Sequence, residues 1–416
     1  MNIAIFTDSF LPHVSGVCSA VINQANELCR QGNEVMIFRP KAFGASGKKH
    51  LERSGELHAK IRDILISLPS NRQPGLHIAL PMFAPTLPVL RKFRPDVLHV
   101  HTEWGCGWEG VMMAKMLRKP LVGTFHTFFA EPEYLKQFHL PNHRLTQNMM
   151  WRYSVFFYNH CDRVLSPSRS VIEQLSTRGI DRTPHLMSNG IPATPLCSEE
   201  AINRKRMEMG LSGPTFSYIG RLSGEKCLPV LLQAFQEVLR KRSDAQLLLV
   251  GDGPTRTELE SLSRKLGISG NTVFTGRIPH RQLMSENLPR VSRIFVTPST
   301  SENQPVSLLE AMSMGVPVVG AEAKGIPELV RHEKTGLLFP PGDAHAMAHA
   351  MLRLLDDANL WQICHENCFA LARDNHIENV VLQLTTHYQQ TVAAHKSRRT
   401  RKLNRRLRAM PRPPRA

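Results

Sequence analysis

The sequence predicts an α/β protein made of two doubly wound, Rossmann-like domains that face each other across a cleft. Three observations support this fold class. Short apolar runs alternate with helix-length segments in two separate series, as parallel sheets built from β-α-β units require. Between the series lies IPATPLCS, residues 191–198, whose two prolines and absent periodicity indicate a linker. The composition is globular, with 42% apolar and 21% charged residues.

The first series begins with a predicted strand over residues 3–7. A turn containing Pro12 and Gly16 follows, and then a helix over residues 17–31, which ends at Gly32. The remaining strands predicted in this half cover residues 34–38, 96–101, 120–125, 162–166 and 185–188. Residues 1–190 are therefore predicted to form the N-terminal domain.

The second series is predicted to form a domain over residues 200–374. Its strands are expected over residues 215–219, 246–250, 272–274, 293–297, 316–320 and 336–339, and its first helices over residues 228–242 and 255–266. From Asp343 almost to Lys396 the pattern is helical. We expect residues 375–395 to form a helix that packs back toward the N-terminal domain.

Charge is concentrated at the C-terminus. The chain carries +17 overall, and residues 396–416 contain ten basic residues and no acid. A segment with so few apolar residues is predicted to be disordered. Such a polycation would attract anionic lipid headgroups or nucleic acid.

The cysteines and the N-terminus indicate a reducing compartment. Eight cysteines occur without C-x-x-C spacing, and only Cys364, His365 and Cys368 cluster, without evident further metal ligands. The opening MNIAIFTDSF lacks the basic start and long apolar stretch of a signal peptide. No apolar run reaches the roughly 18 residues that a membrane-spanning helix needs. We therefore predict a cytoplasmic protein.

The most informative segment is TPSTSENQPVSLLEAMSMG, residues 297–315, which follows a strand and opens a helix. Its acids Glu302 and Glu310 are spaced E-x7-E. With the helix starting near Pro305, they would hold two ends of an extended ligand. The free N–H groups around Val306 and Ser307 would attract a phosphate. The alternative is that both are ordinary acids, common at helix starts.

Three other segments follow predicted strands. SYIGRLSGEKCL offers Arg221 and Lys226, a planar fork and a point charge that suit a diphosphate, although surface pairing with Glu225 is the alternative. In TDSFLPHVSGV, Gly16 would let the backbone approach a ligand, or simply form a turn. In PLVGTFHT, His126 would project into the cleft and bond a sugar hydroxyl, although a lone histidine is more often structural.

Other ligand classes lack their motifs. Gly251-Asp252-Gly253 does not continue into a G-x-G-x-x-G fingerprint, and no P-loop occurs, so nicotinamide, flavin and P-loop kinase chemistry are disfavoured. His99 and His101 lie two residues apart on one strand and are compatible with a metal pair, but no carboxylate-rich motif accompanies them.

Taken in order, these motifs resemble the retaining nucleotide-sugar glycosyltransferases of family four, which have the two-domain GT-B fold. The resemblance covers about residues 1–390. It rests on PHVSGV, TFHT, SNGIP, GRLSGEK, LLLVGDGP, the E-x7-E segment and GVPVVG-AEAKGIPELV. It implies an N-terminal domain that binds the acceptor and a C-terminal domain that binds the donor. It also implies a hexosyltransferase that needs no metal and no cofactor, in agreement with the absence of a D-x-D motif.

The resemblance also implies residue roles. Arg221 and Lys226 match the pair that binds the donor diphosphate, and Glu310 matches the acid that holds the ribose. Glu302 matches the acid that contacts the donor sugar, together with the backbone N–H groups of the segment Asn303, Gln304, Pro305 and Val306, in which Pro305 itself has no N–H. His126 matches the histidine near the reacting carbon, so His126 and Glu302 are the predicted catalytic residues. Gly16 matches the loop that packs against the diphosphate.

The departures from the family pattern point to the acceptor. Cys227 replaces a usual glycine, and Asn303-Gln304-Pro305 replaces Gly-Phe-Gly. Diacylglycerol glucosyltransferases often have Gln at the position of Gln304, and PHVSGV resembles their P-x-V-N-G-V. The resemblance is therefore nearest to diacylglycerol glucosyltransferases and related glycolipid synthases. It favours transfer from a UDP-sugar to a membrane lipid.

The remaining alternatives concern the acceptor and the partner. A polysaccharide or lipopolysaccharide acceptor, or a nucleotide-sugar 2-epimerase with the same fold, are the other activities considered. A second basic segment runs from Lys41 to Arg62. With the tail it would dock the protein on the anionic inner face of a membrane, or it is simply a solvated surface. No nucleic-acid-binding module is recognisable, so specific nucleic-acid binding is not expected.

Overall fold

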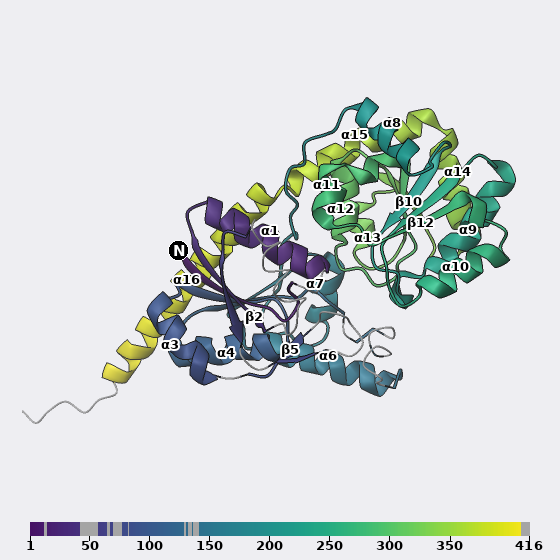
Figure 1. The fold of residues 1–416 in the computed structure, drawn as a ribbon. Coiled ribbons are helices and arrows are strands. Elements are labelled where there is room, and N and C mark those ends of the chain that lie inside the picture. The colour runs from purple at the N-terminus through teal and green to yellow at the C-terminus, as the bar shows by residue number, and fades with distance from the viewer. Residues whose placement is uncertain are drawn as a thin grey trace, which may run out of the picture.

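The computed structural model describes residues 1–11, 15–41, 57–64, 67–69, 77–81, 83–128, 130–131, 135 and 141–408. Its two parallel sheets lie in separate lobes, each wrapped by helices (Figure 1). The predicted fold class, two doubly wound Rossmann-like domains, is confirmed.

The N-terminal sheet has seven parallel strands in the order β3-β2-β1-β6-β7-β8-β9. In chain order they are β1 (Asn2–Phe6), β2 (Glu34–Pro40), β3 (Lys60–Ile64), β6 (Val97–Val100), β7 (Leu121–Thr124), β8 (Arg163–Ser166) and β9 (His185–Leu186). A separate antiparallel pair is formed by β4 (Ser67–Pro69) and β5 (His77–Ala79). Because the chain moves outward from β1 to β3 and then returns to β6, the strand order reverses beside β1, where doubly wound sheets bind ligands.

Alternate residues of β1 enter two separate cores. Ala4 and Phe6 pack with the side of the sheet covered by α3 (Phe83–Phe93), α4 (Gly105–Leu117), α6 (Arg144–Tyr158) and α7 (Arg169–Ser176). Ile3 and Ile5 pack on the opposite side, with α1 (Gly16–Arg30) and α16 (Ile377–Arg408). Both faces are therefore covered, as a parallel sheet requires.

The C-terminal sheet has six parallel strands in the order β12-β11-β10-β13-β14-β15. They are β10 (Thr215–Ile219), β11 (Gln246–Val250), β12 (Thr272–Gly276), β13 (Ile294–Thr297), β14 (Val318–Ala321) and β15 (Gly336–Phe339). The helices are α8 (Glu199–Glu208), α9 (Leu228–Lys241), α10 (Arg256–Lys265), α11 (His280–Ser285), α12 (Val306–Ser313), α13 (Ile326–Leu329), α14 (Ala344–Asp356) and α15 (Ala358–Asp374), with 3-10 turns at Gly224–Lys226, Ser269–Asn271 and Leu288–Val291. The order reverses at β10 and β13, which places their carboxyl ends at the natural ligand position.

Two connections join the lobes, and they run side by side. Ile191 N–H donates to the carbonyl of Asn375 at 3.1 Å, and Ile377 N–H donates to the carbonyl of Ile191 at 2.8 Å. Gly190 fits here because its φ is +75° and an added Cβ would lie 2.5 Å from Ile377 Cδ1. From this point α16 runs along the N-terminal lobe, contacting α1 and β7 (Figure 1).

The basic tail differs from its prediction. Residues 396–408 were expected to be disordered, but they continue α16, and residues 409–416 lie outside the described part of the chain. Arginine and lysine are good helix formers, and no proline occurs between Pro341 and Pro411, so a helix anchored by its packed half extends. Arg398 also bonds Asp162 at 3.3 Å, which holds this extension against the N-terminal lobe.

The second basic segment is described only in part. Residues 42–56 of the segment from Lys41 to Arg62 lie outside the described residues. Its end forms β3, an edge strand in which Lys60 pairs with Glu34 at 2.7 Å. The described end is therefore part of the sheet, and the rest of this predicted membrane-contacting segment stays a prediction.

Candidate active site

The carboxyl ends of β10 and β13 bring two predicted site residues together. These strands are neighbours in the sheet, so the loops that follow them lie side by side. Lys226 Nζ lies 2.5 Å from Glu302 Oε1, although the residues are 76 positions apart in the chain. Their side chains are 17% and 18% exposed, so the pair is shielded from water but reachable from the loop surface.

Glu310 is held by a histidine that the sequence did not single out. Glu310 lies in α12, and its Oε1 is 2.6 Å from Nε2 of His280, the first residue of α11. Burial alone lowers the pKa of His280, but the hydrogen bond and charge of Glu310 outweigh burial, and the net shift is upward. The sequence could have indicated His280 only by its position, because it follows the carboxyl end of a predicted strand, now β12.

Arg221 lies in the loop directly after β10. Among the described residues, its guanidinium has no hydrogen-bonded or ionic partner, whereas its carbonyl accepts from Tyr218 Oη at 3.1 Å. Within the described residues, the Arg221 side chain makes no hydrogen bond or ion pair with Lys226 or Glu302. The guanidinium is therefore available to an anion without loss of an existing contact.

Two helix N-termini meet where the lobes approach each other. Pro305 is the N-cap of α12 and offers no side-chain cap, so the N–H groups of Val306 and Ser307 have no partner among the described residues. A Cβ added to Gly16, the first residue of α1, would lie 3.8 Å from Val306 Cγ2. Both helix dipoles thus point their positive ends at one place, an arrangement that favours an anion.

The side chains of Asn303 and Gln304 tie the lobes together. Asn303 Nδ2 donates to the carbonyls of Phe125 and His126, at 3.0 and 3.1 Å. Gln304 Oε1 accepts from the backbone N–H of Asn189 at 2.8 Å. The family resemblance implies that backbone N–H groups of this segment bind the sugar donor. The structure shows in addition that the side chains of Asn303 and Gln304 bond the N-terminal half of the chain.

Glu328 and Lys324 extend this junction between the lobes. Glu328 Oε1 accepts from Ser168 Oγ, the N-cap of α7, at 2.8 Å. Lys324 Nζ pairs with Glu131 at 2.8 Å. The segment AEAKGIPELV, singled out as a family motif, therefore contacts the N-terminal lobe through charged side chains.

On the N-terminal side, His126 follows β7 and is nearly buried, with 9% of the residue exposed. Its Nε2 lies 2.9 Å from Nδ1 of His101. Burial lowers the pKa of His126 to about 4, so the imidazole is neutral at pH 7. His126 therefore offers one ring nitrogen at most to a ligand, because the other is already bonded.

Two buried carboxyl groups lie behind this histidine at the same sheet edge. Asp8 Oδ2 accepts from Thr102 Oγ1 at 2.7 Å, and burial raises its pKa. Glu103 accepts from Ser154 and Tyr158, at 2.7 and 3.2 Å, and burial raises its pKa to about 7. Neither acid was singled out from the sequence, because their partners come from distant elements.

His99 has a structural role. Its Nδ1 and Nε2 lie 2.7 Å from Tyr388 Oη and Thr124 Oγ1, so both ring nitrogens are occupied. Within the described ranges, no group of three or more His, Cys, Asp or Glu side chains is arranged to hold a metal, at Cys364–Cys368 or elsewhere.

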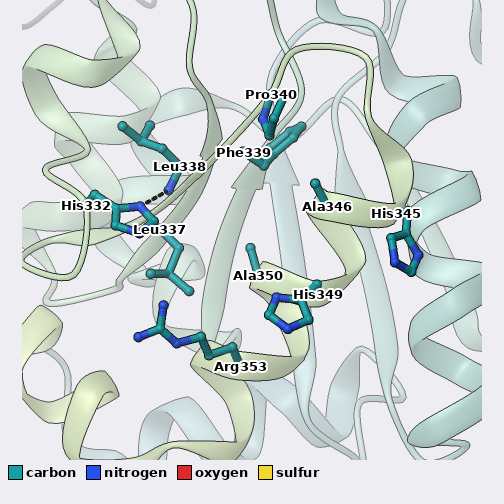
Figure 2. A pocket seen from close by; sticks show the side chains of 10 residues that line it. All are labelled: His332, Leu337, Leu338, Phe339, Pro340, His345, Ala346, His349, Ala350 and Arg353. Atoms are coloured by element: carbon teal, nitrogen blue, oxygen red, sulfur yellow. Dashed lines mark hydrogen bonds between the residues drawn. The ribbon is translucent and has the colours of Figure 1, made fainter.

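One further pocket lies away from these strand ends. It lies between β15 and α14, lined by Leu337, Phe339, His332, His345 and His349 among others (Figure 2). His332 Nδ1 already accepts from Leu338 N–H at 3.1 Å, and His345 pairs with Glu237 at 2.8 Å. We do not place the predicted donor in this pocket.

Comparison with known proteins agrees with this arrangement. The chain matches the Glycosyltransferase Family 4 model over residues 14–194 and the group 1 glycosyl transferase model over residues 213–357. The crystal structure of Anabaena HepE in complex with UDP superposes with a TM-score of 0.75 and 20% identity, over 94% of this chain and all of that one. The architecture is thus that of a GT-B glycosyltransferase.

Two curated relatives specify the family. The GDP-mannose-dependent alpha-mannosyltransferase of Mycolicibacterium smegmatis is 30% identical over 345 residues, 82% of this chain and 84% of the relative. The alpha-monoglucosyldiacylglycerol synthase of Streptococcus pneumoniae is 27% identical over 362 residues, 85% of this chain and 78% of the relative. The chain belongs to glycosyltransferase family 4. It is a retaining enzyme that transfers a sugar from a nucleotide sugar.

Proposed function

We propose that the enzyme moves a hexosyl group from a UDP-sugar to a membrane lipid acceptor such as diacylglycerol. The bond between the anomeric carbon and the diphosphate oxygen breaks, and a bond to the acceptor oxygen forms on the same face of the sugar. Residues 200–374 would bind the donor, and residues 1–190 the acceptor. The observation that carries the donor site is the meeting of the α1 and α12 N-termini, together with the pairing of Lys226 with Glu302 in the loop before α12.

The diphosphate would lie between these N-termini. The partnerless N–H groups of Val306 and Ser307 would bond its oxygens, and Arg221 and Lys226 would balance the charge that grows as it leaves. Gly16 leaves room for this approach on the opposite side. No metal is required, because two cations and two helix ends already oppose the diphosphate charge.

The Lys226–Glu302 pair would change partners when the donor binds. At 2.5 Å the two side chains satisfy each other in the unliganded protein. A diphosphate would draw the ammonium group, and the freed carboxylate would accept hydrogen bonds from sugar hydroxyls. Glu310, already positioned by His280, would accept from the ribose hydroxyls.

The acceptor proton would leave through the donor itself. His126 is neutral and its pKa of about 4 makes it a weak base at pH 7. It would bond the sugar near the reacting carbon, while the departing phosphate oxygen takes the acceptor proton. This assignment follows front-face attack with retention.

The two groups of relatives indicate which donors and acceptors should be compared. The Streptococcus relative, a monoglucosyldiacylglycerol synthase, supports a lipid acceptor, as does a second such synthase from Acholeplasma laidlawii at 24% identity. The Mycolicibacterium relative is named for GDP-mannose, so GDP-mannose is the competing donor. A polysaccharide acceptor is the competing acceptor.

Thermal shift tests the donor site. UDP, GDP and ADP sugars are each added to the wild type, and one is expected to raise the melting temperature. Lys226→Ala and Glu310→Ala should abolish that rise, whereas the exposed Lys241→Ala and Glu258→Ala should keep it. Retention of the full rise in both site variants would refute the donor assignment.

Radiolabelled sugar transfer tests the acceptor. Label is expected in extracted lipid when the purified enzyme receives the donor and lipid vesicles. Label in saccharide alone would establish the polysaccharide alternative, and nucleotide release without transfer would favour a 2-epimerase.

The basic end of α16 would hold the protein on an anionic inner leaflet. No helix in the described parts of the chain is both long and apolar enough to span a bilayer. Lys396, Arg399 and Arg401 are exposed on this extension. Each basic residue near an anionic surface contributes about 1 kcal/mol. The variant that combines Lys396→Gln, Arg399→Gln and Arg401→Gln should lose co-sedimentation with anionic vesicles. Equal binding of the wild type to neutral and anionic vesicles would count against this role.

A further inference from the structure

Three histidines form a buried series behind the sheet edge that meets the donor lobe. The rings of His99 and His101 lie 3.9 Å apart, and His101 Nδ1 lies 2.9 Å from His126 Nε2. His99 and His101 are 0% and 1% exposed. Burial is the main cause that lowers the pKa values of all three, so each imidazole is neutral and carries one proton.

The contact between His101 and His126 needs one donor and one acceptor. Either His101 donates from Nδ1, or His126 donates from Nε2. The second ring nitrogen of His101, Nε2, is buried and has no partner within the described residues. If His126 donated, the His101 proton would sit on Nε2 as a buried N–H without an acceptor. Such groups are rare because they forfeit a hydrogen bond with water, whereas buried acceptors without a donor occur more often.

The first arrangement therefore determines where His126 carries its proton. If His101 donates to Nε2 of His126, the His126 proton sits on Nδ1. That nitrogen has no partner among the described residues, and it is not fully enclosed by protein. The donor lobe is immediately adjacent, because Asn303 Nδ2 bonds the His126 carbonyl at 3.1 Å.

We propose that His101 is a positioning residue: it holds His126 in the tautomer that presents an Nδ1–H group toward the donor sugar. This proposal rests on the proposed function, in which His126 contacts the sugar. His99 supports the series from behind, since Tyr388 of α16 and Thr124 of β7 occupy both of its nitrogens. A histidine at position 101 thus acts through a neighbour and touches no substrate.

A pair of amide substitutions separates this role from packing. An asparagine side chain places its amide near the Nδ1 position of histidine, and a glutamine side chain places it near Nε2. His101→Asn should therefore keep kcat/KM for sugar transfer within about threefold. His101→Gln should lower it about 10–100-fold, the usual effect of removing a group that orients a site residue. Both variants should keep the wild-type thermal shift with nucleotide.

A double-mutant cycle tests whether His101 acts through His126. In a His126→Ala background, His101→Gln should lower kcat/KM by less than about twofold, because coupled sites are non-additive. An undiminished loss in that background would overturn the proposal. Equal losses in the asparagine and glutamine variants would overturn it as well.

Nitrogen NMR gives a readout that does not depend on activity. In protein labelled with ¹⁵N-histidine, the His126 signals are assigned by their loss in His126→Ala. The proposal expects the proton on Nδ1 in the wild type and in His101→Asn. A proton on Nε2 would refute it. A proton on Nδ1, with full activity in His126→Ala, would instead refute the sugar contact in the proposed function.

Discussion

The two sheet edges that meet at the active site are built from opposite kinds of side chain. The C-terminal edge is charged: Lys226 pairs with Glu302, and Glu310 bonds His280 and raises the pKa of its imidazole. The N-terminal edge is lined by the neutral imidazoles of His126 and His101, and burial raises the pKa of Glu103 to about 7. In the proposed function, the charged edge would face the departing diphosphate, where charge appears in the reaction.

Under the proposed function, this division would let one site handle a charged leaving group beside a neutral acceptor. Charges placed in water-excluded surroundings stabilise a developing charge most strongly when they are already oriented. In the proposed function, the C-terminal edge would satisfy that condition because Lys226 and Glu302 already hold each other in the unliganded protein. The N-terminal edge avoids a second set of charges, which would compete for the same counterions.

The largest test removes an ion from the charged edge. Lys226→Ala should lower kcat/KM for transfer about 10²–10³-fold, since the leaving diphosphate loses an oriented cation. Steady-state transfer of a labelled sugar measures this, with the exposed Lys241→Ala as the matched control. A loss below threefold would show that the charged edge does not receive the diphosphate.

The next test measures how the free energy of unfolding depends on pH through Glu103, at the N-terminal edge. Glu103 has a folded pKa of about 7, above its unfolded value near 4.5. Its neutral form therefore stabilises the fold below pH 4.5, and this contribution is lost as the pH rises to 7. Relative to the wild type, Glu103→Gln should gain about 1–3 kcal/mol of stability between pH 4.5 and pH 8.

Denaturant unfolding at several pH values measures the difference between Glu103→Gln and the wild type. The same change at the exposed Glu366 should leave the difference constant with pH. A constant difference at Glu103 would mean that this carboxyl group is ionised throughout.

Gly16 tests whether the junction is shaped for a ligand. Among the described residues, a Cβ there meets only Val306, at an ordinary contact distance of 3.8 Å, so the described part of the fold accepts alanine. Gly16→Ala should leave the melting temperature unchanged and raise the donor KM about tenfold, the equivalent of 1.4 kcal/mol. An unchanged KM would show that no diphosphate packs against this helix start.

The smallest expected effect concerns the loop that carries Lys226. Cys227 has φ +52°, in the left-handed region that costs non-glycine residues about 1–2 kcal/mol. Glycine removes that strain but has more freedom to lose on folding, so Cys227→Gly should stabilise by up to about 1 kcal/mol. Thermal unfolding measures this. A destabilised variant would show that the contacts of the thiol outweigh the strain.

Local pattern was sufficient to predict the strands of the two sheets, except β3. Apolar runs such as residues 215–219 and 246–250 coincide with β10 and β11, because buried parallel strands need continuous apolar sequence. Local pattern was insufficient where a proline lies inside a helix. No element was predicted over residues 83–93, yet these residues form α3 with Pro88 inside it, and the helix packs against α4.

The site was predictable only where a residue lies at a strand end with a recognisable neighbour. Lys226, Glu302 and Glu310 met that condition, and the structure pairs the first two directly. The roles of His101 and His280 depend on partners 25 and 30 positions away, and the Asn303 contacts span 177 and 178 positions. No spacing rule encodes such distances, because the folded chain alone brings those atoms together.

The paired crossings at Ile191 and Ile377 limit how the lobes can move. The two connecting segments are hydrogen-bonded to each other at one place, so they cannot rotate independently. Any opening of the lobes would therefore carry both crossings together, about one shared hinge.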